Sequence, residues 1–232
     1  DWDLWLGAAP KRAFAADVYH PFKWRDWQDF GSGAMGDFGC HILDPVFTAL
    51  EIQAPISIEA VNEGTNTEVW PGPETIVFEF PGTKHTVGGT IKVTWRDGGL
   101  KPPVELAQLP DGIDLPGAGS LFIGEGGVMI LPHVAMPLLY PQPKFNQFQM
   151  PDVKARNHWH DWVDAVVSGQ KTTDGFEYAG PLSETVQLGN IAARLPGTKL
   201  EWNTETMKIT GHDNAKAMLT KSYRSGFEVD AA

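Results

Sequence analysis

The sequence predicts an α+β fold in which an open, mostly antiparallel β-sheet carries helices on one face. Between residues 56 and 140, apolar side chains alternate with polar ones, and turns rich in glycine separate the alternating runs. After residue 157 the apolar positions recur at helical spacing instead. Because short turns connect neighbouring strands, we expect them to run antiparallel. Helices that follow such a sheet in sequence pack together on one of its faces.

We expect one domain over residues 1–232, made of four consecutive segments. They are an ordered lead-in loop over 1–35, an active-site helix over 36–50, the sheet over 56–140, and helices with closing segments over 157–223. In the last segment Trp159, Trp162 and Val166 lie on one helical face, and Gly169 follows as a stop signal. A chain of this length is long enough to bury a sizeable hydrophobic core.

Charge and composition exclude several classes of partner. The net charge is −11 and basic residues are scattered singly, so neither nucleic acid nor an acidic membrane surface is an expected partner. No apolar run approaches the roughly 18 residues of a membrane helix. The chain reads as soluble, with a cytoplasmic or exported location left open. Nine tryptophans and twelve phenylalanines suit flat platforms for sugar rings as well as core packing.

The string from Gly31 to Gly36 fits the pattern G-x-G-x-x-G of dinucleotide-binding proteins. That pattern binds a dinucleotide only as the turn between a buried strand and a helix of a βαβ unit. The residues before it, Trp24 to Phe30, are polar and aromatic, and an antiparallel sheet follows. A glycine-rich helix entry, where backbone passes close to a ligand or a neighbouring segment, is therefore the favoured interpretation.

Asp37 and His41 are four residues apart, so on a helix they share one face. Oxidation of an alcohol needs a base that takes the hydroxyl proton as hydride leaves, and imidazole, with its pKa of about 6.5, suits that task. A neighbouring carboxylate would orient the ring. The alternative is an acid at a helix start followed by a satisfied core histidine.

Two further candidates favour structural interpretations. His158 and His160 are two residues apart on an expected helix, so their rings diverge and a shared metal is not expected. Cys40, the single cysteine, excludes an internal disulfide and is interpreted as a small buried hydrophobe rather than a nucleophile or metal ligand. No metal site is therefore predicted.

The run Asp37-x-Gly39-x-His41-x-x-Asp44 behind Gly31 to Gly36 resembles the substrate-domain helix of the glucose-fructose oxidoreductase, inositol dehydrogenase and MocA family. The resemblance extends over nearly the whole chain. It includes Asp1 to Gly7, Tyr19-His20-Pro21, Trp24-Arg25, Asp97-Gly98-Gly99, Phe176 to Thr185 and Leu200-Glu201-Trp202.

This resemblance implies a two-domain enzyme whose N-terminal Rossmann domain binds NAD or NADP. That domain, with the family's lysine from a Glu-Lys-Pro motif, has no counterpart here, so we expect a segment before Asp1, and the cofactor-binding residues stay unknown. The domain in hand would place a sugar or glycoside against the nicotinamide and bury its open sheet face in a homo-oligomer. Asp37 and His41 match the family's substrate-binding and proton-transfer pair. The loop that the resemblance places near the sugar contains Tyr19, His20, Trp24 and Arg25.

The leading hypothesis is the substrate-binding and catalytic half of an NAD(P)-dependent oxidoreductase that acts on a sugar or glycoside hydroxyl. A second hypothesis is an NAD-dependent glycoside hydrolase or lyase that works through a transient keto-sugar. A third is a non-catalytic sugar-binding or dimerisation module that lacks its cofactor domain. The sequence alone does not separate the three.

Overall fold

The computed structural model describes residues 1–64 and 66–228 and divides the chain into two compact units. The first unit contains residues 1–100 and 184–232, and the second contains residues 101–183. Within the described residues, no helix is long and apolar enough to cross a membrane. The expectation of a single domain stays a prediction.

The first unit is built on a five-stranded antiparallel sheet with strand order β3-β2-β1-β7-β8. Its strands are β1 (Ser57–Asn62), β2 (Glu74–Pro81), β3 (Thr90–Arg96), β7 (Leu200–Asn203) and β8 (Lys208–Thr210). The antiparallel sheet is as predicted. Two of its strands, β7 and β8, come from the segment expected to hold helices and closing segments, and β7 extends the sheet by pairing with Ser57 and Ile58 of β1.

Helices α2 (Gly33–Leu50) and α5 (Phe176–Ala193) supply the cover for one face of this sheet. Ile76, Phe78 and Phe80 alternate along β2 and are fully buried. The Phe47 ring of α2 meets Phe80 edge-on at 5.8 Å between centroids. A Cβ added at Gly189 of α5 would lie 2.8 Å from the Phe78 ring, so helix and strand are in close contact. The α+β fold with helices on one face is confirmed.

The lead-in segment is more ordered than a loop. It contains α1 (Trp2–Leu6) and the 3-10 helix η1 (Lys23–Asp26), and α2 already begins at Gly33 rather than at residue 36. Aromatic rings form a cluster here, with neighbouring centroids 4.8 to 6.0 Å apart. Its members are Trp2, Trp5, Tyr19, Trp27 and Phe30. These aromatic residues therefore serve packing. Helix α6 (Asp213–Ala217) completes the first unit.

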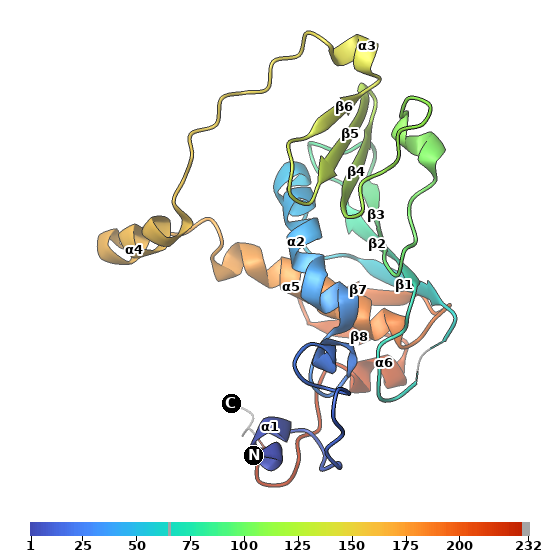
Figure 1. Ribbon diagram of the computed structural model, residues 1–232, viewed down its shortest axis with the longest axis vertical. Coiled ribbons are helices and arrows are strands. Elements are labelled where there is room, and N and C mark those ends of the chain that lie inside the picture. The colour runs from blue at the N-terminus through green and yellow to red at the C-terminus, as the bar shows by residue number, and fades with distance from the viewer. Residues whose placement is uncertain (65, 229–232) are drawn as a thin grey trace. The chain divides into compact units, whose positions relative to one another are not determined.

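The second unit contains a three-stranded antiparallel sheet of order β4-β5-β6, drawn in yellow-green in Figure 1. Its elements are η2 (Val104–Ala107), β4 (Gly119–Gly124), β5 (Gly127–Pro132), β6 (Leu138–Tyr140), α3 (Gln142–Phe145) and α4 (His158–Ser168). A small core gathers Ala107, Val128, Ile130 and Tyr140. The prediction for α4 is confirmed, because Gly169 ends the helix in a left-handed conformation with φ of 69°.

Candidate functional site around the start of helix α2

The glycines before and inside α2 make room for the protein's own atoms. A Cβ at Gly31 would lie 2.6 Å from the carbonyl oxygen of Arg25, and one at Gly33 would lie 2.9 Å from the Trp70 ring. The preceding element is the 3-10 helix η1 and not a strand. A pyrophosphate therefore does not fit against these glycines, and the glycine-rich helix entry is the correct interpretation.

Asp37 and His41 lie on α2 one turn apart, and both side chains are exposed. The Nε atom of Arg25 donates to Oδ1 of Asp37 at 3.0 Å. The His41 ring centroid lies 5.7 Å from that of Phe38, one turn before it on the same helix. Because His41 is exposed, the alternative of a core histidine is wrong. Asp37 and His41 are accessible to a ligand.

Arg25 is held in place from several sides. Its guanidinium carbon lies 4.3 Å from the centroid of the Phe22 ring and 4.6 Å from that of Trp24, both cation–π distances. Its Nη1 also donates to the carbonyl oxygen of Phe22 at 3.3 Å. Arg25 therefore reaches Asp37 as a stacked, hydrogen-bonded group rather than as a freely rotating side chain.

Two other predicted sugar-contact residues, Tyr19 and His20, differ in burial. Tyr19 is only 7% exposed, and its ring packs against Trp27 at 4.8 Å and Trp2 at 5.2 Å between centroids. His20 is exposed and precedes a cis peptide bond to Pro21. Burial of Tyr19 in the aromatic cluster counts against a direct sugar contact, whereas Trp24 joins the pair through Arg25.

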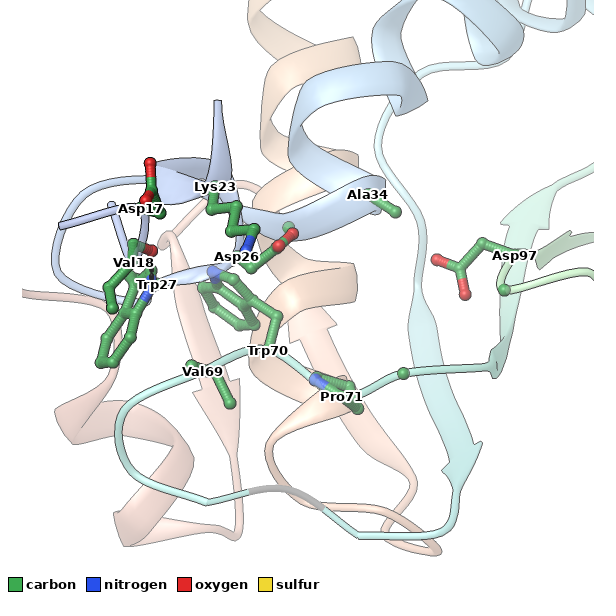
Figure 2. Close-up of a pocket in the computed structure, with 13 residues that line it drawn as sticks. Asp17, Val18, Lys23, Asp26, Trp27, Ala34, Val69, Trp70, Pro71 and Asp97 are labelled. Carbon is green, nitrogen blue, oxygen red and sulfur yellow. Dashed lines mark hydrogen bonds between the residues drawn. The ribbon is translucent and has the colours of Figure 1, made fainter. Parts of the chain in front are cut away.

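A pocket of about 630 Å³ opens beside the first turn of α2. Figure 2 shows the Trp27 and Trp70 rings and the Asp97 carboxylate on its walls. The lining residues are Asp17, Val18, Lys23, Asp26, Trp27, Gly33, Ala34, Val69, Trp70, Pro71, Gly72, Asp97 and Gly98. None of the six site residues predicted from the sequence is among them.

Asp97 is anchored at the end of the β2–β3 ladder. Its carboxylate accepts hydrogen bonds from the Trp95 Nε1 at 2.9 Å and from the Glu74 backbone nitrogen at 3.1 Å. Burial raises the pKa of Asp97. Glu74 beside it is only 4% exposed, and burial, with the charge of Asp97, raises the pKa of Glu74 to about 8. Glu74 therefore carries its proton at neutral pH.

Sequence reasoning missed this acidic pair and the pocket. The available signals were the Asp97-Gly98-Gly99 turn and an acidic residue at the first position of β2. Neither signal indicates that Trp70 and Asp97 reach the start of α2, because the three segments are far apart in sequence.

Neither Cys40 nor the two histidines of α4 lie in surroundings typical of a nucleophile or a metal site. Burial is the main cause that raises the pKa of the Cys40 thiol, and the Asp44 carboxylate adds to it, so the nucleophilic thiolate is disfavoured. His158 and His160 lie exposed in the first turn of α4. The described residues contain no group of three or more His, Cys, Asp or Glu side chains that could hold a metal ion.

Residues 1–87 match the family model described as "Oxidoreductase family, C-terminal alpha/beta domain". Over these residues the chain is similar to the C-terminal domain of an oxidoreductase family, and the α+β fold is consistent with that description. The model is that of the Gfo/Idh/MocA family, and the match supports the resemblance to that family over residues 1–87, which hold the lead-in segment, α2, β1 and β2. No curated protein matches the chain.

Proposed function

We propose that this chain is the substrate-binding and catalytic half of an NAD(P)-dependent oxidoreductase that acts on a sugar or glycoside hydroxyl. The observation that carries the proposal is the placement of Asp37 and His41 one turn apart on the exposed face of α2, with Asp37 held by Arg25. The oxidoreductase-family match over the same residues supports it.

The proposed reaction removes a hydride and a proton from one carbinol group. A ring nitrogen of His41 takes the hydroxyl proton, the C–H hydrogen leaves with its electron pair, and a C=O bond forms. Asp37 orients the imidazole or the hydroxyl through its second carboxylate oxygen. A nicotinamide dinucleotide supplies the hydride acceptor when bound. The glycines of the α2 entry have no room for its phosphates, so other residues would have to hold it.

Two features of the first unit support a sugar substrate and a homo-oligomer. Trp24 and exposed Phe22 present rings around Arg25, an arrangement that suits the apolar side of a sugar ring. On the sheet, Val61 is 60% exposed on the face opposite Ile58 and Ala60. We propose that a second copy covers this outer face in a homo-oligomer.

The test uses the whole protein encoded by the gene, incubated with NAD or NADP and a panel of sugars and nitrophenyl glycosides. Formation of NADH or NADPH in proportion to keto-product supports the dehydrogenase. Release of nitrophenol without net reduced cofactor supports the redox glycosidase instead. Absence of both, together with retained sugar binding, supports the non-catalytic module.

The matched variants are His41→Ala and His160→Ala. His160 is an exposed histidine on α4 and is not one of the residues of the proposed site. We expect His41→Ala to abolish turnover and His160→Ala to leave it unchanged. Full turnover by His41→Ala overturns the catalytic assignment.

A further inference from the structure

The pocket beside α2 has no role in the chemistry assigned to Asp37 and His41. Its wall includes Ala34, which lies three residues before Asp37 and seven before His41. At 3.6 residues per turn, these three positions share one side of the helix. At 1.5 Å per residue, the pocket wall lies about 10 Å along the helix from His41.

We propose that this pocket is a binding subsite for the non-reacting end of the substrate, and that the substrate is an uncharged glycoside of at least two rings. The inference rests on the proposed function, which places the reacting hydroxyl at His41. A ligand that spans from Ala34 to His41 is longer than one sugar ring. A pocket of about 630 Å³ also exceeds the needs of a single hydroxyl group.

Trp70 forms a fixed wall of the subsite. Its indole Nε1 donates to the carbonyl oxygen of Gly31 at 2.8 Å, and its ring lies against the backbone of Gly33. The backbone nitrogen of Trp70 also donates to the carbonyl oxygen of Asp26 at 2.8 Å. An aromatic ring that is already ordered loses little entropy when a sugar ring stacks on it.

The charges around the pocket select for hydroxyl donors and against anions. Three acidic residues are among its lining residues, Asp17, Asp26 and Asp97, against one basic residue, Lys23. Carboxylate oxygens accept hydrogen bonds from sugar hydroxyls, and an excess of acidic over basic residues disfavours a uronic acid. Asp97 is oriented for this task by Trp95 and the Glu74 backbone. The occupant that these walls fit is therefore a neutral sugar ring.

The test is a titration of the 232-residue chain followed by NMR of its tryptophan indole N–H groups. Trp70→Phe assigns the Trp70 signal and removes the indole donor. The probes are glucose with cellobiose and maltose, galactose with lactose, and glucuronic acid as the anionic comparison. We expect at least one disaccharide to shift the Trp70 signal and to bind roughly tenfold more tightly than its monosaccharide.

The variant that separates the pocket from the reacting site is Asp26→Asn. The side chain of Asp26 is exposed, and the change keeps the backbone carbonyl that Trp70 uses. Loss of a charged acceptor lowers disaccharide affinity about tenfold, whereas monosaccharide affinity stays the same. Glu63→Gln, at an exposed acid outside the pocket, is the matched control and changes neither affinity.

Three results overturn the subsite: equal affinity for both members of every sugar pair, no response of Trp70 to any disaccharide, or an Asp26→Asn chain that binds disaccharides normally. Failure of the proposed function looks different. In that case the whole protein reduces no cofactor, while the Trp70 signal still responds to disaccharides. If the whole protein reduces cofactor but the Trp70 signal does not respond to any disaccharide, the subsite proposal is wrong and the proposed function still holds.

Discussion

Arg25 and Asp37 are joined by a 3.0 Å ion pair between Nε and Oδ1 that ties the 3-10 helix η1 to helix α2. The Asp37 side chain is 47% exposed, so the pair adds at most about 1 kcal/mol to stability. Its main consequence is geometric. A carboxylate held on one oxygen presents the other in a fixed direction beside the face that carries His41.

Arg25→Lys tests this geometric role. Lysine keeps the positive charge but loses the planar group that stacks on Phe22 and Trp24. We expect kcat to fall roughly tenfold through misplacement of Asp37, with a melting temperature within a few degrees of wild type. The measurement is steady-state turnover with a thermal melt of each variant. Arg156→Lys, at another exposed ion pair, is the control and leaves turnover unchanged.

Tyr19→Phe decides whether the Tyr19 hydroxyl touches substrate. The ring lies in the aromatic cluster, so Phe preserves the packing, and turnover and KM should both match wild type. Tyr19→Ala removes the ring and should cost about 3–5 kcal/mol of unfolding free energy, measured by chemical denaturation. A Tyr19→Phe protein that folds normally but has a strongly raised KM contradicts the packing interpretation and restores Tyr19 as a sugar contact.

Gly33→Ala tests the contact between α2 and Trp70. Gly33 has φ of +63°, and an added Cβ would lie 2.9 Å from the Trp70 ring, so Ala is both strained and crowded. We expect a loss of about 1–3 kcal/mol in unfolding free energy. Gly72→Ala, also at the pocket but with no atom within 4 Å of the added Cβ, is the control. Equal stability of the two variants would rule out the close packing.

Glu74 gives the first unit a pH-dependent stability. Its pKa rises from an ordinary 4.5 to about 8 in the folded chain because burial, then the charge of Asp97, disfavours the carboxylate. Below pH 4.5 both folded and unfolded states hold the proton. Between pH 4.5 and about 8 only the folded state does, so stability falls as pH rises through this window. The raised pKa of Asp97 acts in the same direction.

Thermal melts of wild type and Glu74→Gln between pH 5 and 9 measure this effect. Gln keeps the shape but cannot ionise, so the decline in melting temperature with pH should flatten and the variant should melt roughly 5 °C higher at pH 8. Glu59→Gln, at an exposed acid on β1, is the comparison and keeps the wild-type slope. If the melting temperature of Glu74→Gln falls with pH as steeply as that of wild type, a group other than Glu74 causes the pH dependence.

The sequence predicts well where a local pattern decides the structure. Ile76, Phe78 and Phe80 alternate, and they form the buried face of β2. Helix α4 ends at Gly169 because glycine readily adopts the left-handed conformation there. The shared helical face of Asp37 and His41 likewise follows from spacing alone.

Long-range pairing is what local patterns leave open. Strand β7 pairs with β1 across some 140 residues of chain, from Ser57 to Glu201, and no spacing in the sequence indicates that partner. The same holds for the pocket, where Asp26, Trp70 and Asp97 come from three segments. For Tyr19 the sequence predicts a sugar contact because the residue belongs to a family motif, but the structure buries its ring in the aromatic cluster.

The central claim is that His41 moves the proton in an oxidation of a sugar hydroxyl, and chemical rescue tests it most directly. His41→Gln in the whole protein should lose at least about 100-fold in cofactor reduction while melting like wild type. Added imidazole should restore part of that rate in proportion to the concentration of its free base, and should leave wild type unaffected. A His41→Gln protein with the wild-type rate contradicts the claim, and so does a folded, inactive one on which imidazole has no effect.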